Sequence, residues 1–306
     1  MKRCSNLLVT YDSSDDSDSP SFEEREQPPP VKKRKLPSLS SSIVIPGPID
    51  NPSLHQGRIR TTPHVEGQFA AHVYVSLLIR RRSTLYKLMQ DAILEAKKIV
   101  PTLRELWSRD DNKEPSSPIE LHISLSRPVY LRAHQREDFR KAVKALSKGH
   151  KPFTVSFATF SELVNDEKTR TFLTIEVGAG YHELTSLSKG LTPALHAIRQ
   201  KEFYTTPRFH ASIAWALLDR LHSGNAPVRD QEDHTPHGTT TSTPEAHSAI
   251  ALEDFPTIPY LPKMLVSKLN AVFSGDLASP TVGSFDIDQI TVKIGKEVSS
   301  WSLAGI

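Results

Sequence analysis

Two short segments of the chain alternate apolar and polar residues, as the strands of a half-buried sheet do. The first reads LHISLS and contains His122-Ile123-Ser124, and the second reads FHASIAW and contains His210-Ala211-Ser212. A period of two places the His and the Ser of each triplet on one face of its strand, while the apolar neighbours face a core. The pattern therefore predicts two strands that carry the same pair of polar side chains.

The repetition of His-x-Ser is more informative than either triplet alone. A single histidine in a strand is usually a structural residue, and the chain has 13 histidines. Only these two have a serine two residues later in strongly strand-like sequence, and they lie 88 residues apart, which suits two halves of one domain. Two imidazoles and two hydroxyls on two such strands can converge on one anionic centre.

This set of groups suits the cleavage of a phosphodiester in RNA, which supplies its own nucleophile, the 2′-hydroxyl. One histidine would remove the 2′ proton and the other would protonate the leaving 5′ oxygen, which gives a 2′,3′-cyclic phosphate. Imidazole titrates near neutral pH, so both roles are accessible. The serine hydroxyls would donate to the charged phosphate oxygens. We expect no metal and no other cofactor, because the sequence has no carboxylate cluster or HExxH pattern.

The composition indicates in which kind of compartment the protein works and how much of the chain is folded. Of the 306 residues, 37% are hydrophobic and 23 are proline, so part of the chain is expected to be unfolded. Cys4 is the only cysteine, which excludes an internal disulfide and favours a reducing compartment. We find no signal peptide and no apolar run long enough to cross a membrane. The net charge of +3 does not by itself argue for nucleic-acid binding.

Residues 1–60 are predicted to be a disordered tail, because they are rich in acidic residues, serine and proline. A basic block, Lys32 to Lys35, interrupts this tail. It suits a nuclear import signal, and an ordinary charged linker is the alternative. On this block we predict a nuclear protein.

The remaining residues predict an α+β domain over 68–301, with antiparallel sheets flanked by helices. A polar, His-rich segment at about 222–257 is predicted to be a flexible insertion. Strands are expected at 69–79, 121–131, 152–164, 170–178, 208–218 and 285–295, and helices at 83–100, 134–147, 182–203 and 259–273. Pro193 could kink the third of these helices.

Two further residues near the second triplet suit RNA binding. Tyr204 lies six residues before His210 and could stack on a base, although aromatic residues more often pack at a helix end. Arg208 directly precedes the strand and could meet a phosphate, or it could be a solvated residue.

Three segments together resemble the 2H phosphoesterase superfamily, namely LHISLSR, NDEKTRTFLTIEV and FYTTPRFHASIAWAL. The similarity extends over about residues 68–294. Within the superfamily, the KTRTF run and the position of Tyr204 are most similar to the 3′-to-5′ exoribonucleases that trim the uridine-rich end of U6 small nuclear RNA. The long insertion after the second triplet departs from the family pattern.

The resemblance implies a two-lobed, pseudo-symmetric fold with the active site in a groove between the lobes. It implies acid–base roles for His122 and His210, phosphate binding by Ser124 and Ser212, and base stacking by Tyr204. The turn at Asn165 and Asp166 would lie near the terminal base. The expected partner is RNA and the expected state is a monomer without membrane association. Another 2H enzyme, such as a cyclic phosphodiesterase or a tRNA-end enzyme, and an inactive RNA-binding module are the alternatives.

Overall fold

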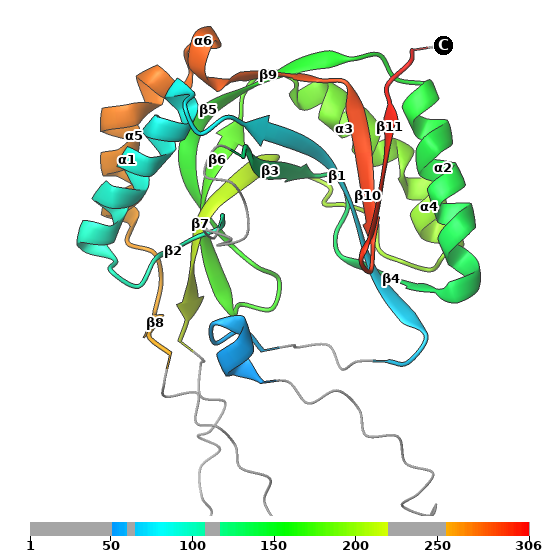
Figure 1. The fold of residues 1–306 in the computed structure, drawn as a ribbon, viewed down its shortest axis with the longest axis horizontal. Coiled ribbons are helices and arrows are strands. Elements are labelled where there is room, and N and C mark those ends of the chain that lie inside the picture. Colours follow the sequence, from blue (N-terminus) through cyan, green and yellow to red (C-terminus); the bar gives the residue numbers. More distant parts are fainter. Residues whose placement is uncertain (1–50, 60–64, 108–116, 220–254, 306) are drawn as a thin grey trace, which may run out of the picture. The chain divides into compact units, whose positions relative to one another are not determined.

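Helices and strands alternate along the chain and give an α+β fold, as the sequence predicts (Figure 1). The computed structural model describes residues 51–59, 65–107, 117–219 and 255–305. All of them belong to one compact unit, Gly47–Ile306. The basic block Lys32 to Lys35 and most of the expected insertion lie outside the described residues.

The centre of the fold is a sheet in the order β11-β10-β1-β3-β7-β6-β5-β9, whose neighbouring strands are all antiparallel. Three short strands lie off this path: β4 pairs with β1, β2 pairs with β7, and β8 runs parallel to β7. The strands are β1 (Gln68–Ile79), β2 (Arg104–Glu105), β3 (Ile119–Ser124), β4 (Val129–Arg132), β5 (Phe153–Val164), β6 (Arg170–Val177), β7 (His210–Leu218), β8 (Thr257–Ile258), β9 (Ser284–Ile287), β10 (Gln289–Ile294) and β11 (Glu297–Ser302).

Helices pack against this sheet at both of its ends. In Figure 1, α1 lies beside α5 at one end, and α2 lies against β10 and β11 at the other. No helix in the described ranges has the length and apolar character needed to cross a lipid bilayer. The helices are η1 (Pro52–His55), α1 (Thr84–Ile99), η2 (Ala133–Gln135), α2 (Arg136–Lys148), α3 (Tyr181–Gly190), α4 (Thr192–Ala197), α5 (Lys263–Leu277) and α6 (Pro280–Gly283).

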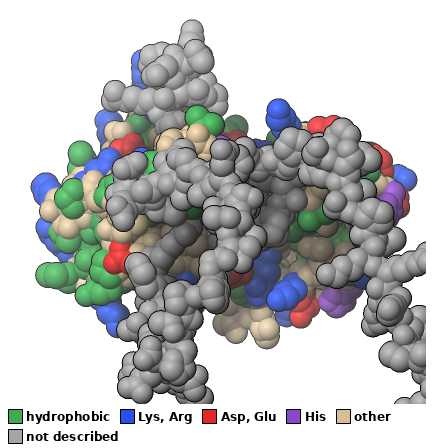
Figure 2. Space-filling model, turned by 90° about the horizontal axis from the view of Figure 1, so that it is seen from below, with side chains coloured by type: hydrophobic (Ala, Val, Ile, Leu, Met, Phe, Trp, Pro, Cys, Tyr) green, Lys and Arg blue, Asp and Glu red, His purple; other side chains and the backbone are tan. Residues whose placement is uncertain are grey.

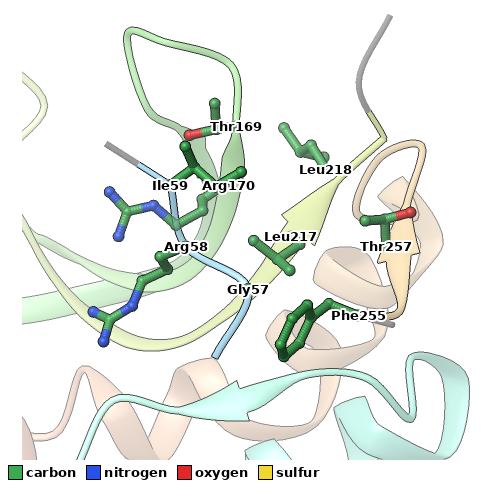
Figure 3. A pocket seen from close by; sticks show the side chains of 9 residues that line it. All are labelled: Gly57, Arg58, Ile59, Thr169, Arg170, Leu217, Leu218, Phe255 and Thr257. Carbon is green, nitrogen blue, oxygen red and sulfur yellow. The ribbon is translucent and has the colours of Figure 1, made fainter. Parts of the chain in front are cut away.

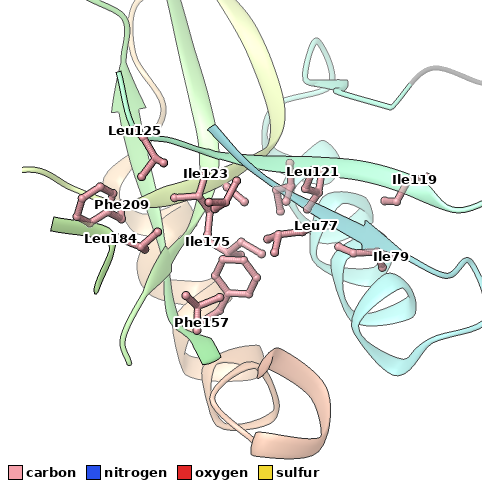
Figure 4. Packing of buried hydrophobic residues seen from close by; sticks show 14 of the residues in the cluster. Leu77, Ile79, Ile119, Leu121, Ile123, Leu125, Phe157, Ile175, Leu184 and Phe209 are labelled. Atoms are coloured by element: carbon pink, nitrogen blue, oxygen red, sulfur yellow. The ribbon is translucent and has the colours of Figure 1, made fainter. Parts of the chain in front are cut away.

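Alternation along the strands decides which face of the sheet is buried. Leu77 of β1, Ile123 of β3 and Ile175 of β6 are buried together with Phe157 of β5, and they form one apolar cluster (Figure 4). Their sequence neighbours point to the opposite face of the sheet. The sheet therefore has one face in the core and one face on which polar side chains gather.

Helix α1 forms where the apolar spacing predicts it. Ser83 caps its first turn by accepting a hydrogen bond from the backbone N–H of Tyr86 (3.2 Å), and Pro101 follows its last turn. The apolar residues at helical spacing that identified the helix are all buried, namely Leu85, Leu88, Met89, Ala92, Ile93 and Ala96. Their burial explains why a sequence pattern alone locates this element.

Two expected segment boundaries need correction. Residues 51–59 were expected in the disordered tail, but they form η1, in which Asn51 accepts a hydrogen bond from the N–H of Ser53 (3.0 Å) and Pro52 is buried. The insertion was expected to extend to residue 257, but Thr257 and Ile258 already form β8 beside β7. Both segments have little periodicity of their own and are ordered by β7. β8 pairs with β7, and Gly57, which follows η1, packs against Leu217 of β7.

Three expected elements are divided in the structure. The strand expected at 121–131 is two strands, β3 and β4, which both pair with β1. The helix expected at 182–203 is interrupted at Leu191, because Pro193 occupies the first turn of a new helix, α4, and lacks the N–H that a continuous helix needs. The last expected strand is two strands, β9 and β10, which pair with different partners, β5 and β1. The helix expected at 259–273 begins at Lys263 and extends to Leu277.

Candidate active site

The two His-x-Ser triplets lie on adjacent antiparallel strands, β3 and β7. Ile123 and Ala211 are direct partners in this pair and both are fully buried. Because the pairing is antiparallel, His122 lies across from Ser212, and Ser124 lies across from His210. All four polar side chains therefore share the open face of the sheet. The sequence predicted the shared face, and the structure adds that the two strands are neighbours.

Both imidazoles favour the neutral form more than a free histidine does. The side chain of His122 reaches solvent, yet the surrounding protein desolvates it and lowers its pKa, and the proximity of His210 lowers it further. Burial also lowers the pKa of His210, against the opposing effect of a hydrogen bond from its Nδ1 to the carbonyl oxygen of Arg208 (2.6 Å). That bond leaves Nε2 of His210 available for proton transfer.

A third histidine, which sequence reasoning missed, contacts this group from β1. Nε2 of His72 lies 3.0 Å from Oγ of Ser124, and its ring lies 5.4 Å from that of His122. Burial lowers the pKa of His72 to about 4, so the ring is neutral near pH 7. A neutral imidazole at hydrogen-bond distance can orient the Ser124 hydroxyl. Alternation in HVYVS places His72 on the polar face, but His72 is not followed by a serine two residues later and so lacks the His-x-Ser pattern.

Arg208 is close to His210 but pairs with a carboxylate. Its Nε donates to Oε1 of Glu176 (2.8 Å), and Glu176 is the cross-strand partner of His210. The hydroxyl of Ser161 donates to the same carboxylate oxygen (2.9 Å). Glu176 therefore organises the β6 side of the site, and the guanidinium of Arg208 is held there by an ion pair.

Tyr204 joins two other loops through its hydroxyl and its ring. The hydroxyl donates to Oδ1 of Asp166 in the β5–β6 turn (2.8 Å), and Oδ2 of Asp166 accepts from Arg127 (2.8 Å). The guanidinium of Arg127 lies 3.8 Å from the centre of the Tyr204 ring. The Tyr204 side chain remains 41% exposed, so the ring keeps surface on which a base can stack.

Asn165 shapes the turn that carries Asp166. Its Oδ1 accepts hydrogen bonds from the backbone N–H groups of Thr169 (2.9 Å) and Arg170 (2.8 Å), while Lys168 adopts a left-handed backbone with φ of 53°. Side-chain oxygens that bond the following backbone are typical of such turns. Asn165 and Asp166 thus have different roles: Asn165 stabilises the turn, and Asp166 contacts Tyr204.

Replacement of Tyr204 tests the stacking interpretation. We expect Tyr204→Ala to weaken substrate use by about ten- to a hundredfold, since one base–aromatic stack contributes ~1–3 kcal/mol. Tyr204→Phe keeps the ring and loses the bond to Asp166, and we expect a loss of about two- to tenfold. Steady-state kinetics on a short uridine-ended RNA would measure both effects, which should appear mainly in KM.

Asp166→Ala is the matched control for this prediction. It removes the acceptor of the Tyr204 hydroxyl and the partner of Arg127 while leaving the ring in the chain. Its effect should equal that of Tyr204→Phe or exceed it, and the two changes should not add, because both break the same bond. Full activity of Tyr204→Ala would show that the ring only packs.

No metal centre is evident in the described part of the chain, where no three His, Cys, Asp or Glu side chains are grouped so that they could hold an ion. The site as described therefore consists of imidazoles, hydroxyls, one aromatic ring and two ion-paired arginines. Such groups can move protons and bind an anion, and the anion they suit is a phosphodiester next to a base.

Comparison with known proteins agrees with this chemistry. A family model described as an uncharacterised conserved protein, HVSL, matches residues 29–302. U6 snRNA phosphodiesterase 1 of Mus musculus is 31% identical over 196 residues, which cover 62% of this chain and 68% of the mouse protein. The protein of the same name from Bos taurus is 29% identical over 226 residues, covering 69% and 80% of the two chains.

Among solved structures, Kluyveromyces marxianus Usb1 with uridine monophosphate aligns with a TM-score of 0.49 and 13% sequence identity, over 76% of this chain and 98% of that chain. The family itself is established by the sequence relatives and by the extent of the family model. With the paired His-x-Ser strands on one open face, these matches identify the chain as a member of the U6 snRNA phosphodiesterase 1 family.

Proposed function

We propose that this protein is a 3′-to-5′ RNA exonuclease that trims the oligo-uridine end of U6 small nuclear RNA without a metal. The observation that carries the proposal is the placement of His122 and His210 on adjacent strands, with Ser124 and Ser212 beside them on the same face. Relatives named for phosphodiesterase activity on U6 snRNA support the substrate.

The reaction requires two proton transfers around one phosphate. The 2′-hydroxyl of the penultimate nucleotide gives its proton to one neutral histidine and attacks the phosphorus. The bond from phosphorus to the 5′ oxygen of the last nucleotide breaks, and the other histidine, protonated, gives its proton to that oxygen. The last nucleoside leaves, and the RNA ends in a 2′,3′-cyclic phosphate, or in the monophosphate that forms when water opens it in a second step.

The remaining residues bind the substrate in this proposal. Ser124 and Ser212 donate to the non-bridging oxygens, where negative charge grows in the transition state. Tyr204 stacks on a terminal base from the face of its ring that Arg127 leaves open. The Asn165–Asp166 turn, which contacts Tyr204 through Asp166, lies near that base, and Arg208 lies beside His210, where it meets a phosphate. We further infer a monomer with two lobes, in which β3 and β7 form the floor of the groove between them.

A chelation assay tests this function. We would incubate the protein with an oligo-uridine-tailed RNA in EDTA and resolve the 3′ ends. Stepwise shortening to ends that carry cyclic phosphate or monophosphate is expected. Opening of a supplied 2′,3′-cyclic phosphate without shortening would identify another 2H enzyme, and binding without turnover would identify an RNA-binding module. A strict requirement for Mg²⁺ or Mn²⁺ would contradict the two-histidine mechanism.

The pH profile follows from the lowered histidine pKa values. One histidine must be neutral and the other protonated, so kcat/KM, which reports the free enzyme, should be bell-shaped. Because burial lowers both pKa values from 6.5, the acidic partner loses its proton at lower pH than a free imidazole. The maximum is therefore expected below pH 6.5. A maximum in the alkaline range would contradict this assignment.

We also propose that the protein acts in the nucleus and that Lys32 to Lys35 direct it there. This block lies outside the described residues, and the compact unit begins at Gly47. Removal of residues 1–46 should therefore preserve turnover and release a tagged protein into the cytoplasm. Nuclear retention of the truncated protein in cell imaging would place the import signal elsewhere.

A further inference from the structure

A β-bulge in β7 extends the open face of the sheet beyond the catalytic histidines. Ser212 pairs with Thr174, but Ala214 pairs with the adjacent Leu173, so Ile213 is an additional residue in β7. After the bulge, Trp215 lies opposite Phe172, which shares a face with Thr174. Trp215 therefore points to the face of Ser212, whereas simple alternation would turn it into the core.

Three arginines gather around Trp215, and we name them the arginine cluster: Arg58, Arg104 and Arg170. The guanidinium carbons of Arg58 and Arg104 lie 5.6 and 5.8 Å from the centre of the Trp215 ring. Arg104 is the direct cross-strand partner of Trp215, and Arg170 is the partner of Leu217, two residues further along β7. The cluster thus combines cationic groups with an aromatic floor.

Arg58 and Arg170 approach each other despite their equal charge. Both line one hollow, together with Thr169 and Leu217, and Figure 3 shows their side chains pointing to the same side of it. Burial and the charge of Arg58 together lower the pKa of Arg170. Two cations brought this close repel each other, and the repulsion is relieved when an anion binds between them.

Tight packing holds Arg58 in this position. The preceding residue, Gly57, has φ of 83°, and a Cβ there would lie 2.6 Å from Cδ1 of Leu217 and 2.7 Å from the ring of Phe255. Only glycine fits such a contact. The Nε of Arg58 also donates to the carbonyl oxygen of His55 (2.9 Å). These contacts hold the backbone and the Nε of Arg58 at this place on the surface.

The nearby carboxylates of the described chain offset the charge of the cluster only in part, because Glu167 opposes the effect of Arg58 on the pKa of Arg170. Glu105, adjacent to Arg104 in sequence, accepts from Nζ of Lys97 (2.9 Å). Within the described ranges, none of the three arginines has a carboxylate within ion-pair distance, unlike Arg127 and Arg208. Seen from below, the described surface carries Lys and Arg side chains at several places (Figure 2). Such a surface attracts a polyanion.

We propose that the arginine cluster binds backbone phosphates of the RNA upstream of the scissile bond. The inference rests on the proposed function, because a 3′-to-5′ exonuclease has a single nucleotide on the 3′ side and the rest of its substrate on the 5′ side. Leu217, beside Arg170, lies five residues from Ser212, a distance of about 16 Å along a strand. The cluster therefore contacts phosphates some nucleotides away from the reacting one, and Trp215 supports its guanidiniums.

Substrate length separates this site from the catalytic one. We would compare the Arg58→Ala/Arg170→Ala variant with the wild type on the dinucleotide UpU and on a twelve-residue oligo-uridine. The double variant should lose about tenfold in kcat/KM on the long RNA at 0.15 M salt and keep its activity on UpU. The slope of log(kcat/KM) against log(salt) on the long RNA should become shallower by about 1.4, or about 0.7 for each lost phosphate contact.

Matched variants make the outcome specific. Lys141→Ala/Lys144→Ala removes the same charge from exposed positions of α2 and should leave the slope unchanged. Arg58→Lys/Arg170→Lys keeps the charge and should retain most of the salt dependence, provided that thermal unfolding shows a folded protein. Equal losses on UpU and on the long RNA, or no loss on either, would overturn the proposal. A wild type that cleaves neither RNA would refute the proposed function instead.

Discussion

Replacing His122 or His210 with alanine is expected to lower the rate of RNA cleavage by roughly 10²- to 10⁴-fold in each case. In the proposed mechanism each imidazole moves one of the two protons, so its loss removes one proton transfer. Single-turnover cleavage of an oligo-uridine RNA is the appropriate measurement, because it isolates the chemical step from product release.

The double variant sharpens this test. Because the two histidines act on one phosphate in a single step, the combined loss should fall well short of the product of the single losses. His134→Ala, at an exposed position in η2, is the matched control and should retain full activity. An unchanged rate in either single variant would remove that histidine from the mechanism.

An RNA with a 2′-deoxy sugar at the penultimate nucleotide is expected to resist cleavage completely. That sugar carries the oxygen that attacks the phosphate, so its absence removes the nucleophile and leaves the base and phosphate contacts in place. Gel analysis of the 3′ ends would measure cleavage, and competition with the all-ribose RNA would show that the modified RNA still binds.

The position of the modification provides the control. An RNA with a 2′-deoxy sugar only at its last nucleotide retains the attacking hydroxyl and should be shortened at a normal rate, starting with the removal of that nucleotide. Cleavage of the penultimate-deoxy RNA at a normal rate would mean that water or a side chain attacks the phosphorus, and the histidines would then need other roles.

Local periodicity was sufficient to predict the strands that carry the two triplets and the helix α1, whereas the strand β11 was not expected. The alternation in LHISLS and FHASIAW placed each His and Ser on the exposed side of β3 and β7, and the buried stripe of α1 followed from its spacing. What periodicity lacks is information on which strands become neighbours. The contact between Ile123 and Ala211 joins residues far apart in the chain, and local sequence does not encode it.

The unpredicted parts of the site share this origin. His72 joins the site because β1 pairs with β3, and Arg127 joins it because the β5–β6 turn reaches the loop after β3. Trp215 faces the site only because a bulge shifts the register of β7. Simple alternation along the strand would place it on the opposite face. Each case depends on tertiary pairing, which overrides the local pattern.

The antiparallel contact between Ile123 and Ala211 also makes the two triplets near-equivalent by a local twofold rotation. Because the two histidines are equivalent in this way, they can exchange their roles. The imidazole that protonates the departing oxygen is neutral after the step, and it faces the position that this oxygen has left. A water molecule entering there meets a base, while the opposite imidazole, now protonated, faces the 2′ oxygen. In the proposed mechanism, cleavage thus leaves the two histidines in the protonation states that hydrolysis of the cyclic product requires. The end group that accumulates then depends on how long the product stays bound. Fast release gives the cyclic phosphate, and slow release allows its hydrolysis to the monophosphate.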